Sequence, residues 1–115
     1  MGFTERLNPE AYRGDEPVAI GEHGTEPRGW TYVPERLFGR LVSLGQAYEL
    51  HLLPVIDQYA ATTLNAEQCV TLADELRFLG DVTNDPALDA VLESLIPVVD
   101  AIARDTQRAL DVIGP

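Results

Sequence analysis

Apolar residues in the C-terminal third of the chain recur at steps of three, four or seven positions. The series comprises Leu88, Leu92, Leu95, Val99, Ile102, Ala109 and Ile113. Thr106 fills the one gap, and this spacing places all the side chains on one face of a helix. Asp85 followed by Pro86 is typical of a first helical turn, and Gly114 follows at the far end. The pattern predicts one helix over residues 85–113.

Pro97 lies inside this predicted helix, where it removes one backbone hydrogen bond. The apolar spacing continues through it without a shift, which favours a single kinked helix over two separate ones. Asp89, Glu93 and Asp100 lie together on the side opposite the apolar face. The sequence therefore predicts an acidic ridge along this helix.

Two earlier segments show the same helical spacing. In the first, between Pro34 and Pro54, the apolar positions are Leu37, Leu41, Leu44, Tyr48 and Leu52. In the second, the apolar positions are Cys69, Leu72, Ala73, Leu76 and Leu79. Asn65 and Gln68 have the spacing of a capping box at the start of the second helix, and Gly80 is suited to its end. Residues 54–64 are expected to form a connection.

The first 33 residues lack a sustained period and are rich in Gly and Pro. Val18 with Ile20, and Trp30 with Tyr32, alternate as in strands, so this N-terminal arm forms either a short β-hairpin or an irregular segment packed on the helices. Three amphipathic helices must bury their apolar faces against one another. The expectation is a mainly α fold, a three-helix bundle over residues 34–115, within a single domain that includes the arm.

The charge balance limits the partners. The 115 residues include 19 acidic and eight basic residues, all eight of them Arg, for a net charge of −11. Nucleic acids and anionic membranes attract basic surfaces, so neither is expected as a direct partner. No apolar run is long enough to span a membrane, and no leader pattern is present. Together with the single cysteine, this indicates a cytoplasmic protein.

Catalytic and metal-binding patterns are missing from the sequence. There is no nucleophile paired with a base, no cluster of metal ligands and no phosphate-binding loop. His23 is expected in a solvated loop, His51 as a packing residue and Cys69 in the core. We therefore expect neither an enzyme nor a cofactor or metal site. If the chain were a small enzyme, His51 would be the residue to test.

Binding to a protein remains, because acidic helices with exposed aromatic residues suit a basic protein partner. The alternative is that the acidic residues only maintain solubility. Phe78 lies on the polar side of its helix and either turns under the loop at residues 81–85 or stays exposed. The candidate partner contacts are Asp74, Glu75, Phe78, Asp89, Glu93 and Asp100.

Residues 50–80 carry a resemblance to a known class of proteins. The segments Leu53–Tyr59, Thr63–Gln68 and Leu72–Leu79 are similar to those of small acidic proteins of GC-rich bacteria, some of them immunity proteins. The resemblance implies an inhibitor that neutralises a cognate basic toxin or effector by occluding it. The alternative is a structural or assembly subunit, bacterial or phage-encoded, that contacts its neighbour through the N-terminal arm, chiefly through Trp30 and Tyr32.

Overall fold

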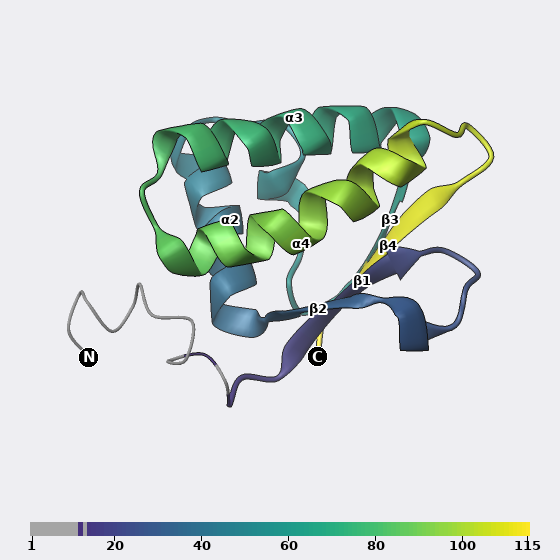
Figure 1. Cartoon of the computed structure of the whole chain (residues 1–115), viewed down its shortest axis with the longest axis horizontal. Coiled ribbons are helices and arrows are strands. Elements are labelled where there is room, and N and C mark those ends of the chain that lie inside the picture. Colours follow the sequence, from purple (N-terminus) through teal and green to yellow (C-terminus); the bar gives the residue numbers. More distant parts are fainter. Residues whose placement is uncertain (1–11, 13) are drawn as a thin grey trace.

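The structure, a computed structural model, describes residue 12 and residues 14–115, in which helices pack on an antiparallel sheet (Figure 1). The strands are β1 (Pro17–Glu22), β2 (Thr31–Pro34), β3 (Ala61–Asn65) and β4 (Ala109–Ile113). The helices are α2 (Glu35–Ala47), α3 (Ala66–Val82) and α4 (Pro86–Ala103). Two 3₁₀ turns, η2 (Pro27–Gly29) and η3 (Leu53–Val55), lie in the connections.

The four strands lie in the order β2-β1-β4-β3, and each neighbouring pair is antiparallel. The last strand in the sequence therefore lies between the first and third strands. Ile20 is opposite Val112 in β4, and Leu64 in β3 is opposite Leu110. All four side chains are buried. Because side chains alternate between the two faces of a strand, one face of the sheet supports the core and the other faces away from the helices.

All three helices contact the sheet, and α2 crosses behind α3 and α4 in the view of Figure 1. The capping box expected at Asn65 and Gln68 is confirmed, since each side chain accepts a hydrogen bond from the other residue's backbone N–H. Asp85 is confirmed as the N-cap of α4, which continues through Pro97. The Asp85 carboxylate also binds the Arg40 guanidinium, which joins the start of α4 to α2.

The expected three-helix bundle is wrong, because the chain forms an α+β fold. The helix predicted over residues 85–113 ends at Ala103. Asp105 then makes a turn in which its carboxylate accepts a hydrogen bond from the Gln107 N–H, at 2.9 Å. The chain beyond the turn becomes β4, which gains backbone partners on both sides.

Three further boundaries differ from the sequence prediction, and one of them is that α3 continues past Gly80, its predicted end, to Val82. The first helix ends at Ala47 and not near Pro54, and the expected connection over residues 54–64 contains most of β3. The N-terminal segment does contain a hairpin, β1–β2. It is not a peripheral arm, because β1 is a central strand of the sheet and supplies the buried residues Val18 and Ile20.

Within the described part of the chain, no helix combines the length and hydropathy needed to cross a bilayer.

Candidate functional site

Helices α3 and α4 pack against each other, and a surface groove of about 510 Å³ runs between them. Its lining residues come from both helices: Arg77, Gly80 and Asp81 from α3, and Asp89, Leu92, Glu93, Ile96 and Pro97 from α4. The groove therefore combines an apolar floor with charged walls. This combination is typical of a surface that holds part of another molecule.

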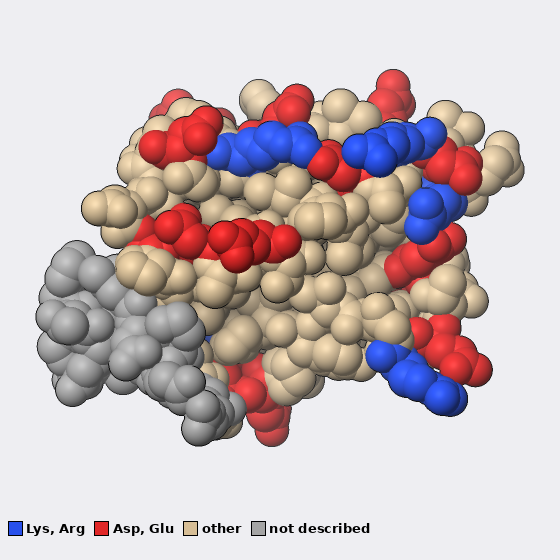
Figure 2. All heavy atoms as spheres, viewed as in Figure 1, with Lys and Arg blue, Asp and Glu red and all other residues tan. Residues whose placement is uncertain are grey.

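The open end of the groove carries three carboxylates, those of Asp81, Asp89 and Glu93. All three residues are exposed. Across residue 12 and residues 14–115, no hydrogen bond or ion pair is recorded to any of their carboxylates. Figure 2 shows acidic side chains along the N-terminal half of α4 and more at the nearby end of α3. This end of the groove is a concentration of uncompensated negative charge.

The other end of the groove is neutralised by an ion pair between the helices. Arg77 of α3 binds the Asp100 carboxylate of α4 and lies 3.9 Å from the Asp74 carboxylate one turn earlier. Asp100 was expected on the free acidic ridge, but its side chain is only 22% exposed and is engaged within the molecule. Of the predicted ridge, Asp89 and Glu93 remain free to meet a partner.

The floor of the groove is apolar and shallow. Leu92 is buried and Ile96 is half-buried. Gly80 has no side chain, so the α3 side of the groove does not cover Leu92 at this point. A Cβ at Gly80 would lie 3.4 Å from Leu92 Cδ1, at ordinary contact distance. Pro97 lacks an N–H, so α4 has no helical donor for the Glu93 carbonyl. A partner therefore meets a small apolar surface formed by Leu92, Ile96 and Pro97.

Glu75 has a structural position that excludes the solvent-facing role expected for it. The residue is 6% exposed. Its carboxylate accepts hydrogen bonds from the backbone N–H groups of His51 at 2.8 Å, Leu52 at 2.9 and 3.1 Å, and Leu53 at 2.9 Å. Three successive N–H groups that converge on one carboxylate form an anion-binding nest. Glu75 thus fixes the segment after α2 onto α3 and does not offer its charge to a partner.

Phe78 and Asp74 lie at a second hollow, of about 290 Å³, between α3 and the segment after α2. The Phe78 ring makes an edge-to-face contact with Tyr48, with centroids 5.2 Å apart and planes at 84°. Phe78 does not line the α3–α4 groove, and its ring partner lies at the end of α2, far in sequence from the loop at residues 81–85. The six residues predicted as one contact set are therefore divided between two surfaces and the buried nest.

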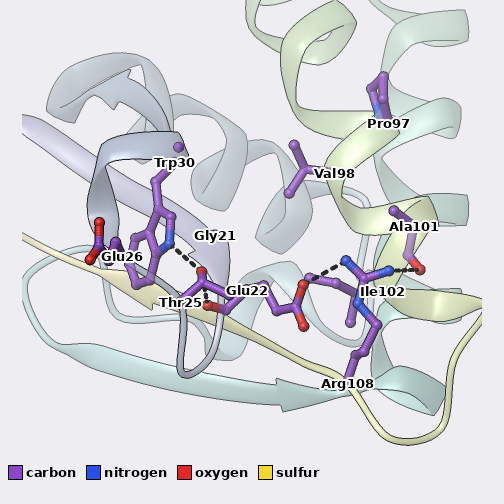
Figure 3. A pocket seen from close by; sticks show the side chains of 11 residues that line it. Gly21, Glu22, Thr25, Glu26, Trp30, Pro97, Val98, Ala101, Ile102 and Arg108 are labelled. Atoms are coloured by element: carbon purple, nitrogen blue, oxygen red, sulfur yellow. Dashed lines mark hydrogen bonds and ion pairs between the residues drawn. The ribbon is translucent and has the colours of Figure 1, made fainter.

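A third hollow, of about 440 Å³, lies between the β1–β2 connection and the C-terminal half of α4 (Figure 3). The Trp30 indole N–H donates to the Thr25 hydroxyl at 2.9 Å. Arg108 donates to the Glu22 carboxylate at 2.6 Å and to the Ala101 carbonyl at 3.1 Å. Figure 3 shows the Glu22–Arg108 pair and the Trp30–Thr25 hydrogen bond in this hollow, and the carboxylate of Glu26 lies 3.5 Å from the Arg28 guanidinium, so this hollow carries less free charge than the groove.

The residues with chemical reactivity lie apart from the groove. The His23 Nδ1–H donates to the Asp111 carboxylate at 2.9 Å, and the Thr63 hydroxyl donates to the same carboxylate at 2.7 Å. Burial raises the pKa of the Cys69 thiol to about 11, so the thiol stays protonated at neutral pH. No cluster of three or more potential metal ligands occurs in residue 12 or residues 14–115.

Asp81 is the groove carboxylate that the sequence prediction missed. The sequence prediction ended the helix at Gly80 and assigned Asp81 to the loop over residues 81–85. Its position one turn after Arg77 placed it on the same polar side of α3, which was the available signal. Only the packing of α4 against α3 shows that Asp81 shares a groove with Asp89 and Glu93.

Comparison with protein-family models, with curated protein sequences and with solved structures gave no match.

Proposed function

We propose that this protein is an acidic binding module that captures a basic protein partner in the α3–α4 groove and neutralises it by occlusion, in the manner of an immunity protein or inhibitor. The observation that carries the proposal is the set of three carboxylates, beside an apolar floor, that no cation within residue 12 and residues 14–115 pairs with. Lys or Arg side chains of a partner would pair with Asp81, Asp89 and Glu93. An apolar side chain would rest against Leu92 and Ile96.

The use of arginine elsewhere in the molecule supports this proposal. Arg36 binds Asp15, Arg40 binds Asp85, Arg77 binds Asp100 and Arg108 binds Glu22. Each pair joins different parts of the fold, so these arginines neutralise carboxylates that hold the structure together. Among residue 12 and residues 14–115, no arginine is paired with Asp81, Asp89 or Glu93, although Arg77 lies in the same groove. Their charge is therefore available to attract and orient a basic partner.

Charged and apolar residues of the groove are expected to contribute differently to binding. Exposed ion pairs contribute little each, about 0–1 kcal/mol, and mainly raise the association rate. Apolar contact at the centre of an interface mainly lowers the rate at which the complex dissociates. The proposal assigns no catalytic step to the chain. It places the protein in the cytoplasm, where a single buried and unpaired cysteine is in keeping with a reducing compartment.

Two charge-matched triple variants test the proposal. The groove variant is Asp81→Asn, Asp89→Asn and Glu93→Gln. The control variant, Glu16→Gln, Glu26→Gln and Glu67→Gln, removes the same charge from exposed positions outside the groove. Immobilised wild-type chain is used to capture a partner from a lysate of its natural host at about 50 mM salt, and the partner is released at about 500 mM, because salt screens exposed ion pairs.

The purified partner then distinguishes the groove from overall charge. Titration calorimetry is expected to show a roughly 10- to 100-fold weaker affinity for the groove variant than for wild type, and a loss of a few-fold at most for the control variant. Equal losses in the two variants would mean that only net charge matters. An unchanged affinity in the groove variant would reject the groove as the binding surface.

A further inference from the structure

Three glycines lie inside α2, α3 and α4, and Gly80 is the one that packing does not require. In α2, a Cβ at Gly39 or Gly45 would lie only 2.8 or 2.7 Å from a neighbouring side chain. A Cβ at Gly80 would make an ordinary contact with Leu92, and the Gly80 backbone is not left-handed. Helix α3 continues past it to Val82, so it is not a C-terminal cap. Glycine destabilises a helix relative to alanine, and nothing in the described part of the chain accounts for it here.

Gly80 lines the α3–α4 groove, where the absence of a side chain gives access to the floor. Leu92 lies beneath it, and the free carboxylates of Asp81, Asp89 and Glu93 come from both sides of the groove. Figure 2 shows acidic side chains on both helices at this end. Glycine allows the backbone of a ligand to approach closely. The groove therefore has room for the main chain of a partner as well as for its side chains.

The residues that line the groove offer no backbone donors to a partner. Their N–H groups are bonded within α3 and α4, and the Asp89 N–H, for example, donates to the Asp85 carbonyl at 2.9 Å. The carbonyls of an extended segment on the apolar floor would lose water and gain no backbone hydrogen bond in return. A helix bonds its own backbone groups and presents only side chains, so an amphipathic helix suits an apolar groove.

We propose that the occupant of this groove is an amphipathic helix of the basic partner, an inference that rests on the proposed function of the groove. Apolar residues one turn apart on the partner helix lie on Leu92 and Ile96, which are also one turn apart on α4. The backbone of the partner helix passes close to Gly80. The lining part of α4, from Asp89 to Pro97, is about 12 Å long at 1.5 Å per residue, which matches about two turns of the partner helix.

The charges of the groove specify where the partner helix carries its basic residues. Lys or Arg on one flank of its apolar residues pair with Asp81 on α3, and those on the other flank pair with Asp89 and Glu93 on α4. The opposite end of the groove is neutralised by the ion pair between Arg77 and Asp100. The basic residues therefore lie at one end of the partner helix, on both flanks, and its other end is neutral.

A designed peptide tests the helix directly. The probe is a labelled peptide, acetylated and amidated, with two leucines one turn apart, lysines on both flanks at one end, and alanine and glutamine elsewhere. Its control keeps the leucines and lysines but has a proline in the middle, which breaks the helix. Fluorescence anisotropy with the full chain is expected to show at least about tenfold tighter binding of the helical peptide. Equal affinities, or no binding of the helical peptide up to about 1 mM chain, would overturn the proposal.

Gly80→Leu tests the close approach without a change of charge. Leucine is a strong helix former and its Cβ has room beside Leu92, so the variant is expected to melt no lower than wild type. Its side chain fills the floor, and the helical peptide should bind at least about tenfold more weakly. The control Ala90→Leu adds an apolar side chain at an exposed position of α4 outside the groove and should leave the affinity unchanged. Equal affinities of the two variants would overturn the proposal.

The captured partner distinguishes this inference from the proposed function. Both Gly80→Leu and the triple carboxylate variant of the groove are expected to lose affinity for it. If only the carboxylate variant loses affinity, an extended segment or single basic side chains occupy the groove; the helix is then rejected and the proposed function stands. If neither variant loses affinity, both proposals are rejected.

Discussion

Glu75→Gln is expected to be among the most destabilising single-atom changes available in this chain. The carboxylate of Glu75 is buried and accepts hydrogen bonds from the backbone N–H groups of residues 51, 52 and 53. Glutamine has nearly the same size and shape, but it replaces one accepting oxygen with an NH₂ group. That NH₂ group then faces a backbone donor. The substitution removes acceptors without creating a cavity, so it isolates the nest from packing.

The magnitude follows from the bonds that are lost. Hydrogen bonds to charged groups contribute about 1.5–3 kcal/mol each, and a buried donor left unsatisfied costs about 1–3 kcal/mol. Loss of one to two of the bonds gives a decrease of about 2–4 kcal/mol in the free energy of unfolding. Total stability for a chain of this length is on the order of 6–17 kcal/mol. The variant should therefore fold but melt roughly 8–20 °C lower.

Urea denaturation followed by circular dichroism measures this free energy. The matched control is Asp74→Asn, at the neighbouring position, where the side chain is 76% exposed and its nearest cation is 3.9 Å away. Its effect should stay within about 0.5 kcal/mol. If the two variants were equally stable, or if Glu75→Gln lost less than about 0.5 kcal/mol, Glu75 would not be the residue that holds the segment after α2.

Three more predictions follow from buried or crowded groups. Because burial raises the pKa of the Cys69 thiol to about 11, iodoacetamide should label it very slowly in native protein at pH 8 and rapidly in urea; fast native labelling would contradict its burial. Hydrogen bonds from Arg36 lower the pKa of Asp15 in the folded protein. The ionised Asp15 carboxylate therefore stabilises the fold fully above the unfolded-state pKa of about 3.9, and this stabilisation is lost as the pH falls through the lower folded-state pKa. Unfolding free energies of wild type and Asp15→Asn should then differ at pH 7 and converge in acid, and a constant difference would refute this. Gly21→Ala would place a Cβ 2.2 Å from the Trp30 ring, so it should cost about 1–3 kcal/mol and shift the tryptophan fluorescence; an unchanged spectrum would show that the ring does not pack there.

The C-terminal helix was predicted too long because, over a short segment, the same sequence can fit both the spacing of a helix and the alternation of a strand. Ala109 and Ile113 lie four positions apart and continue the helical spacing of α4, although the chain there is β4. The residues that β4 buries are instead Leu110 and Val112, which alternate as in a strand. Five residues are too few for periodicity to decide. Asp105, a turn-forming residue, was the stronger local signal.

Local signals identified helix starts correctly, whereas contacts between distant segments had no sequence signal. The capping box at Asn65 depends on neighbours three residues apart and was predicted from them. Burial of Glu75 depends on a segment 22 to 24 residues earlier, and the pairing of Asp100 depends on Arg77, 23 residues away. Spacing along one helix places such residues on its polar side but does not show which neighbour covers that side. The exposure predicted for Asp89 and Glu93 is confirmed, since both residues are exposed and no helix or strand of the described part of the chain packs over them.

The central claim is that the α3–α4 groove receives a basic partner. The most direct measurement is a nuclear magnetic resonance titration of isotopically labelled chain with the captured and purified partner at about 50 mM salt. The account predicts that the largest backbone shift changes occur at Gly80, Asp81, Asp89 and Glu93, while strand β3 changes little. Shift changes confined to the β1–β2 hairpin or to the Phe78 hollow, with the groove unchanged, would contradict it.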